Sequence, residues 1–181
     1  MPLFEHITNN YFQLEVLDGI KLYIMRKDNN ETDKSNYGKF ALTMTISFVV
    51  MYAVMFLNVF QLDHIYISLN RFYMALLMVS PMALTMLGMM GGMYKDKKLN
   101  MIIAVSAVLL FVLSFAGLRS QTAVGDIQYM KGMIPHHSSA IMTSTNANIK
   151  DPELRKLADD IIKAQEKEIA EMKAMINRLE E

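Results

Sequence analysis

Three long apolar blocks dominate the pattern of hydrophobic and polar positions along the chain. They are Phe40–Phe60, Phe72–Met90 and Leu99–Leu118, each 19 to 21 residues long and free of charged residues. A helix of about 20 residues crosses the hydrocarbon core of a bilayer, which is about 30 Å thick. The alternative is a soluble core, but a chain of 181 residues has too little protein to bury three such segments. The pattern therefore predicts three transmembrane helices.

Two amphipathic helices are predicted after the third block. The first begins near Asp126 and extends to about Asn146, with Pro135 inside it, so that it either kinks there or restarts with proline in its first turn. Asp151 followed by Pro152 has the pattern of an N-cap and the first residue of the second helix. Apolar positions then recur at helical spacing to the end of the chain, at Leu154, Leu157, Ala158, Ile161, Ile169, Met172, Ile176 and Leu179.

This predicted hairpin, residues 120–181, has one apolar face and little core of its own. We therefore expect two copies of the chain to form a homodimer that completes a four-helix bundle. The expected fold class is all-α, with a three-helix transmembrane domain over residues 40–119 and an extramembrane two-helix hairpin over residues 120–181.

Residues 1–39 are predicted to form a separate N-terminal segment. Apolar side chains at helical spacing, from Phe4 to Leu17, indicate a short amphipathic helix at the membrane surface within residues 1–24. Residues 26–39 are polar and turn-rich, which favours a linker. No small-residue cleavage site follows a short apolar core, so a cleaved signal peptide is not expected.

Basic residues near the blocks predict the orientation in the membrane. The first block is preceded by Arg26, Lys27, Lys34 and Lys39, and the second is followed by Lys95, Lys97 and Lys98. The opposite side carries Arg71 and Arg119. The positive-inside rule then places the N-terminus in the cytoplasm and the hairpin outside it. In a bacterium this would be the inner membrane, with the hairpin in the periplasm.

The charge and the cysteine content exclude one class of partner and one class of metal ligand. The formal net charge is zero, and residues 120–181 carry eight Lys or Arg against ten Asp or Glu, which excludes a basic nucleic-acid-binding face. The chain has no cysteine. Disulfides and thiolate metal ligands are therefore excluded, and a site for a soft metal ion must use methionine and histidine.

Residues 129–142 concentrate such side chains. On a helix, Met130, Met133 and His137 share one face, and His136 lies at its edge. Two thioethers and two imidazoles suit a soft monovalent cation, Cu(I) or Ag(I), better than a hard one. The alternative is that the histidines are polar core residues whose hydrogen bonds Gln165 or Glu168 satisfy.

The last predicted helix supplies further candidates. Gln165, Glu168, Met172 and Met175 form a single stripe. Met172 and Met175 are candidate thioether ligands or plain packing residues. Glu168 is better suited to orienting a histidine than to binding a soft ion.

Methionine is also concentrated in the second apolar block. A ladder of thioethers there is a candidate path for a soft cation, although such a stripe more often serves interhelical packing. Asp63 and His64, in the loop before it, are either a loading site at the mouth of the path or a solvated polar turn. The methionines that recur every four residues are Met74, Met78, Met82, Met86 and Met90, and Met44, Met51 and Met55 share a face of the first block.

Residues 126–176 resemble domain of unknown function (DUF) family 305, in the Met-Ile-Pro-His-His segment at Met133–His137 and the Gln-x-x-Glu-Ile-x-x-Met segment at Gln165–Met172. The resemblance extends to a subgroup that precedes this domain with three spans. It implies a ferritin-like helical fold and, as in some members, copper binding in the periplasm. Many members carry methionine where this chain has Thr143. Met142 lies one position earlier, and one residue turns a helix by about 100°, which makes Met142 a doubtful ligand.

Two functions are compatible with these features. The first is a membrane-anchored metal-binding protein that sequesters Cu(I) or delivers it to a copper-handling membrane partner. Its expected ligands are Met130, Met133, His136, His137 and Met172, and Asp126 is among the lesser candidates. The second is an interaction module whose hairpin dimerises or docks a membrane partner without metal. A di-iron oxidase is disfavoured because no glutamate precedes a histidine by three residues. No catalytic motif is evident, so we expect a non-enzyme.

Overall fold

The computed structural model describes residues 2–181, with the side chains of residues 19–23, 25 and 34–181. Its described residues contain helices and no strand, which confirms the all-α fold class. The helices are α1 (Pro2–Val54), α2 (Leu69–Met89), α3 (Lys97–Ser120), α4 (Asp126–Asn146) and α5 (Pro152–Glu180), with the short 3₁₀ turn η1 (Leu62–His64) between α1 and α2.

Among the described residues, three helical segments are long and apolar enough to cross a membrane. They are Lys34–Val54 in α1, the whole of α2 and the whole of α3. Most of their side chains are exposed in the isolated chain; Val105 and Leu113, for example, are more than half exposed. Apolar side chains in that position are expected where lipid, rather than protein, surrounds the helices.

The first span departs from the prediction at both ends. Helix α1 ends at Val54, so residues 55–60 of the first apolar block lie outside it, with residues 55–58 in turns. At the other end, residues 26–39 continue the helix, and the predicted linker there is wrong. Extending an existing helix costs far less than nucleating a new one, so a polar segment joined to a long apolar helix can remain helical. Side chains of the predicted amphipathic face at residues 4–17 lie outside the described ones.

The spans are tied together at the end near the loop between α2 and α3. Tyr94 of this loop is buried between the rings of Tyr37 and Phe40, with ring centroids 5.3 and 5.5 Å away. The Tyr37 hydroxyl donates a 2.6 Å hydrogen bond to Oδ1 of Asn100, at the start of α3. Asp96 caps α3, since its carboxylate accepts from the backbone N–H of Lys98 and Leu99.

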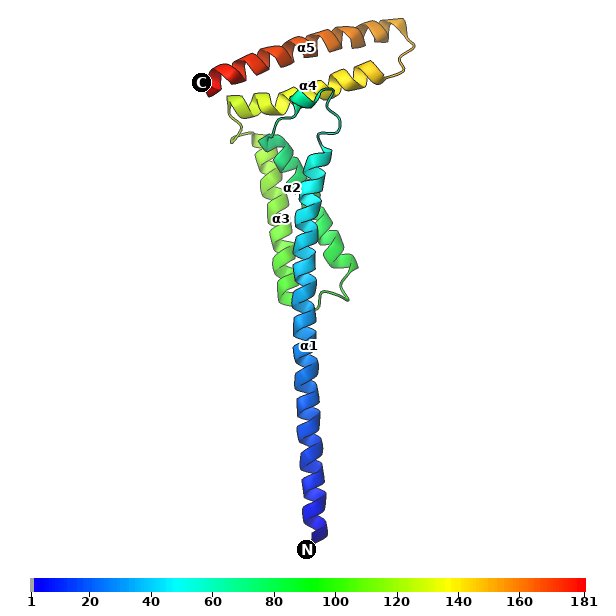
Figure 1. The fold of residues 1–181 in the computed structure, drawn as a ribbon, viewed down its shortest axis with the longest axis vertical. Coiled ribbons are helices and arrows are strands. Elements are labelled where there is room, and N and C mark those ends of the chain that lie inside the picture. The colour runs from blue at the N-terminus through cyan, green and yellow to red at the C-terminus, as the bar shows by residue number, and fades with distance from the viewer. Residues whose placement is uncertain (1) are drawn as a thin grey trace.

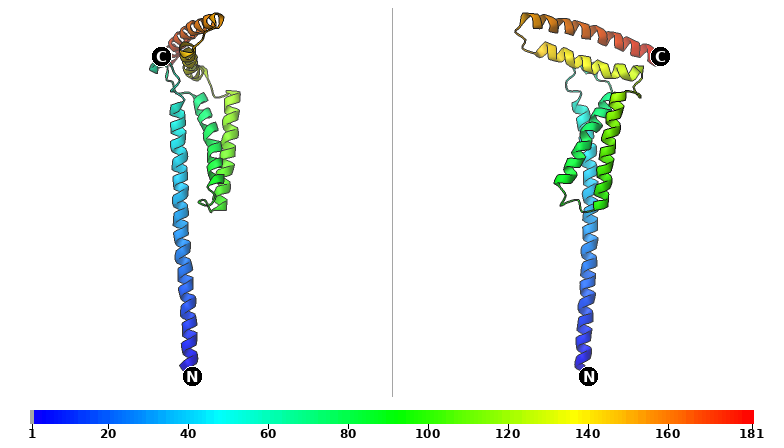
Figure 2. Two further views of the ribbon diagram at one scale, coloured as in Figure 1. Left: turned by 90° about the vertical axis from the view of Figure 1, so that its right-hand side faces the viewer. Right: turned by 180° about the vertical axis from the view of Figure 1, so that it is seen from behind.

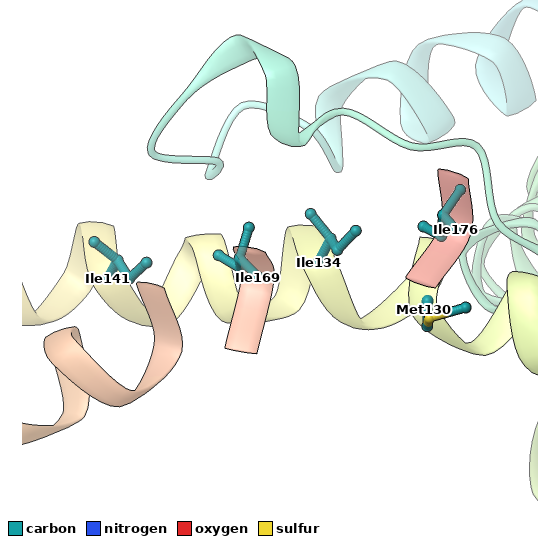
Figure 3. Packing of buried hydrophobic residues seen from close by; sticks show 5 residues of the cluster. All are labelled: Met130, Ile134, Ile141, Ile169 and Ile176. Carbon is teal, nitrogen blue, oxygen red and sulfur yellow. The ribbon is translucent and has the colours of Figure 1, made fainter. Parts of the chain in front are cut away.

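At the opposite end, α4 and α5 form an antiparallel hairpin. Helix α4 lies across the ends of the spans and α5 lies on its far side (Figures 1 and 2). Helix α4 continues through Pro135 without a restart, and Asp151 caps α5 by accepting a 2.7 Å hydrogen bond from the Leu154 N–H. The hairpin core, shown in Figure 3, consists of Met130, Ile134, Ile141, Ile169 and Ile176.

The loop between α1 and α2 fastens the hairpin to the spans. Asn58 donates to the Ser139 hydroxyl, and the backbone N–H of Phe60 donates to the Ser138 hydroxyl over 2.7 Å. His64 contacts the same Ser138 hydroxyl. Because these bonds come from one short loop, that loop sets the position of α4 over the spans.

Candidate functional site

The two histidines of the Met-Ile-Pro-His-His segment face different surroundings. His137 is buried in the hairpin, where its Nε2 lies 2.8 Å from a Glu168 carboxylate oxygen of α5. His136 is exposed and lines a cleft between α4 and the spans. Their ring planes are inclined by 77°. Consecutive helical side chains diverge by about 100°, so the helix itself separates the two imidazoles.

Both ring nitrogens of His137 face acceptors. Its Nδ1 lies 2.8 Å from the backbone carbonyl oxygen of Met133, which can only accept, so Nδ1 carries a proton. Its Nε2 either donates a second proton to Glu168 or, without that proton, presents a lone pair there. Glu168 is thus placed to orient this imidazole, as carboxylates do for metal-binding histidines.

The other predicted ligands on the hairpin do not gather around His137 in one site. Met130 is 5% exposed within the hydrophobic core, and Met172 packs against that core. Both thioethers fill space between isoleucines, a role to which flexible methionine is well suited. Met175 is 43% exposed.

The lesser candidates lie apart as well. Asp126 is exposed at the first position of α4, directly after the N-cap Gly125. Met142 and Gln165 are half-buried, on α4 and α5 respectively. No hydrogen bond or ion pair among those described joins these three side chains to His136 or His137.

The cleft beside His136 gathers a different set of soft side chains. It has a volume of about 380 Å³ and is lined by Met133 and His136 from α4, by Met74 from α2 and by Met55 just beyond α1. The sequence had placed Met55 and Met74 only in the methionine stripes of the spans. Nothing in the spacing along the chain signals that α4 brings Met133 to them, because the loops decide where α4 lies.

Arg71 is the charged side chain of this cleft. Its guanidinium donates to the backbone carbonyl of Met55 and lies 4.3 Å from the centroid of the Phe56 ring. These two contacts hold the positive charge against the α1 side of the cleft. A cation bound there would still feel its repulsion, which favours a monovalent ion over a divalent one.

Among the described side chains, no group of three or more histidine, aspartate and glutamate residues is arranged to hold a metal ion. A closed zinc site without cysteine, or a carboxylate-bridged di-iron site, would need such a group.

Asp63 and His64 contact the hairpin. Lys173 of α5 forms a 2.6 Å ion pair with Asp63, and this hydrogen bond lowers the pKa of the Asp63 carboxyl. His64 is 5% exposed, which contradicts the prediction of a solvated turn at this residue. Burial, chiefly, and the nearby Lys173 lower the pKa of the His64 imidazole, against the opposing effect of Asp63.

A comparison of the sequence with known protein families identifies the family of this chain. Residues 78–176 match the family described as domain of unknown function (DUF305), more than half of the chain. The chain belongs to the DUF305 family. The DUF305 match includes α3, the Met133–His137 segment and most of α5, but it begins after Met55 and Met74.

A relative of this DUF305 protein is the uncharacterized protein L153 of Acanthamoeba polyphaga mimivirus. The two are 37% identical over 145 residues, which cover 78% of this chain and 93% of the relative. No solved structure matches the chain significantly. Because this relative is viral, the comparison does not support a bacterial inner membrane.

Proposed function

We propose that this protein is a membrane-anchored binder of a soft monovalent cation, Cu(I) or Ag(I). The observation that carries the proposal is that three thioethers and one imidazole, from Met55, Met74, Met133 and His136, line a single cleft. Thioether and imidazole groups are ligands for soft Cu(I), whereas hard Mg²⁺ and Ca²⁺ prefer oxygen ligands.

The ligand set is neutral as well as soft. Methionine carries no charge, and His136 coordinates a metal only as the neutral imidazole. The positive charge of Arg71 in the same cleft therefore selects against ions of higher charge. The arrangement assigns Met130 and Met172 to packing and leaves His137 with Glu168 as a separate contact inside the hairpin.

The proposed site lies on the side of the membrane opposite the N-terminus. If α1, α2 and α3 each cross the membrane once, the N-terminal segment and the hairpin lie on opposite sides of it. The excess of basic residues on the N-terminal side supports a hairpin outside the cytoplasm. The cleft would then capture the cation at the outer membrane surface, for sequestration or delivery rather than catalysis.

A titration of the full chain in detergent with Cu(I), in competition with a chromophoric chelator under reducing conditions, tests this function. We expect the double variant Met133→Leu with His136→Ala to bind Cu(I) at least tenfold more weakly than the original chain. The matched control is Met175→Leu with His137→Ala, which changes the same residue types outside the cleft. Equal affinity for both double variants, or no binding by the original chain, would reject the proposed function.

A second candidate function is an interaction module that pairs with another copy of the chain. It is favoured by an apolar stripe that α5 leaves exposed, at Leu154, Leu157, Ile161, Met175 and Leu179. Analytical ultracentrifugation in detergent tests it. This function requires a dimer that Leu157→Glu dissociates and that the histidine variants leave intact.

A further inference from the structure

The guanidinium of Arg71 has no carboxylate partner. None of the ion pairs among the described side chains includes it. Its Nη1 donates to the Met55 carbonyl oxygen, while its other nitrogen atoms have no acceptor in the described part of the chain and are not enclosed by it. A charged group that is partly withdrawn from water is normally paired. The remaining N–H donors of Arg71 are therefore both unpaired and within reach of a small anion.

The cleft that Arg71 lines contains no negative charge to balance it. Among the described residues that form its wall, none is aspartate or glutamate. The proposed metal ligands are neutral, because thioethers carry no charge and a metal-bound imidazole is the neutral form. A monovalent cation would thus bring a second positive charge into a space of about 380 Å³ that already contains one. The neutral polar side chains of the wall are Asn58, Ser68, Asn70, His136 and Ser139.

The position of the cleft makes this charge imbalance more important. Arg71 lies two residues after Leu69, the first residue of the second span, and Leu118 lies two residues before Ser120, the end of the third. Charges at the edge of a bilayer and of the protein interact more strongly than charges in bulk water, because the surrounding dielectric constant is lower. An anion bound between the cation and Arg71 would replace one repulsion with two attractions.

The two positive groups together restrict the kind of anion. The N–H donors of a guanidinium accept many anions, including oxyanions. A soft metal ion is more selective, since carboxylate oxygen suits hard ions such as Mg²⁺ and Ca²⁺. A halide ion is a ligand for Cu(I) and also accepts hydrogen bonds from N–H groups. It is a single atom, and so it fits beside the metal in a cleft of this size.

We propose that the cleft binds its cation together with a halide ion, which is a ligand of the metal and accepts hydrogen bonds from Arg71. This inference rests on the proposed cation-binding function, because the same metal holds the halide. The cation and the halide together are neutral, so the charge of the cleft does not change when both bind. The affinity for the cation therefore increases with the halide concentration.

Chelator competition for Cu(I) with the full chain in a non-ionic detergent tests this proposal. The chelator is one that saturates the coordination of Cu(I) and takes up no halide. Chloride replaces perchlorate under reducing conditions at a constant ionic strength of about 0.15 M. We expect the Cu(I) affinity of the chain, relative to the chelator, to increase at least fivefold. Complexes of Cu(I) with chloride in solution affect the chain and the chelator equally, so they do not alter the ratio.

Substitutions of Arg71 test the origin of the effect. Arg71→Gln removes the charge and should abolish the increase with chloride, whereas Arg71→Lys retains the charge and should retain the increase. The matched control is Arg119→Gln, which removes an exposed arginine in the last turn of α3 that does not line the cleft. It should behave as the original chain does. With bromide in place of chloride, X-ray absorption at the copper edge should show a heavy neighbour of the metal.

The outcomes separate this proposal from the cation-binding function. Equal Cu(I) affinity in chloride and perchlorate would overturn the halide proposal and leave the function intact, whereas no Cu(I) binding in either salt would reject both. An increase that survives in Arg71→Gln, or that disappears in Arg119→Gln, would also overturn the pairing with Arg71. So would an equal increase with phosphate, which would indicate an oxyanion instead of a ligand of the metal. The comparison of salts uses the original chain and requires no variant to fold.

Discussion

The Ser138 hydroxyl of α4 lies 2.8 Å from Nδ1 of His64 and accepts a hydrogen bond from the Phe60 N–H. An imidazole whose Nδ1 carries no proton accepts a hydrogen bond from this hydroxyl, whereas a doubly protonated imidazole can only donate to it. This pairing joins the hairpin to the loop that connects the first two spans. It also makes the contact depend on the protonation state of His64.

The stability of the docked hairpin should fall as the pH decreases below about 6.5, the usual pKa of histidine. The pKa of His64 is lowered in the folded chain, so the unfolded chain binds a proton more readily. The contribution of neutral His64 to stability is therefore fully present above pH 6.5 and is lost as the pH falls through the pKa of the folded chain. Of the charged groups facing His64, Asp63 also has a lowered pKa, but its ordinary value is 3.8. Its contribution is therefore lost at much lower pH.

Hydrogen exchange of residues 58–64 between pH 5 and 8, corrected for the intrinsic pH dependence of exchange, measures this effect. Protection should decrease toward pH 5 in the original chain. In His64→Gln the protection should be independent of pH over this range. A decrease of equal size in both chains would contradict the assignment to His64.

Ser138→Ala should destabilise the docked hairpin by about 1–3 kcal/mol, because it leaves the N–H of Phe60 and the imidazole of His64 without their partner. Ser138 is fully buried, so water cannot replace the hydroxyl without rearrangement. Thermal unfolding followed by circular dichroism measures the loss. Thr145→Ala, an exposed change on the same helix, should alter the unfolding temperature little.

Met130→Leu and Met133→Leu should separate packing from metal binding. Leucine and methionine have similar volumes, so Met130→Leu in the core should cost less than about 1.5 kcal/mol and leave Cu(I) affinity unchanged. Met133→Leu removes a thioether from the cleft and should weaken Cu(I) binding. Chelator competition on the two variants measures the difference, and a larger loss for Met130→Leu would contradict the assignment.

Ile134→Ala should be among the most damaging single changes in the hairpin. Ile134 is fully buried, and large-to-small changes of buried isoleucine cost about 2–5 kcal/mol. Thermal unfolding measures the loss, with Ile161→Ala as the control because that side chain is 37% exposed. Similar losses for the two variants would indicate that another chain covers Ile161.

The spans and the hairpin could be predicted because each depends on local patterns. An uncharged run such as Leu99–Leu118 predicts a long apolar helix, and Asp151 before Pro152 predicts where α5 begins. The end of α1 could not be placed, since Val59 and Phe60 are as apolar as the span itself. Composition does not report where a chain turns.

The candidate site was only partly predictable for a related reason. The spacing of Met133 and His136 follows from the helix, and the structure places both at one cleft. The methionines opposite them, Met55 and Met74, are distant in sequence and are brought near by the loop contacts of Asn58 and Phe60. Those contacts use backbone groups and hydroxyls, whose partners no sequence pattern specifies.

The cleft is lined from both sides of the junction between the spans and the hairpin, by Met55 and Met74 on one side and by Met133 and His136 on the other. The hydrogen bonds that Asn58 and Phe60 donate to α4 therefore hold the two halves of the proposed site together. Loosening this junction would lower the affinity for the cation without changing any of its ligands.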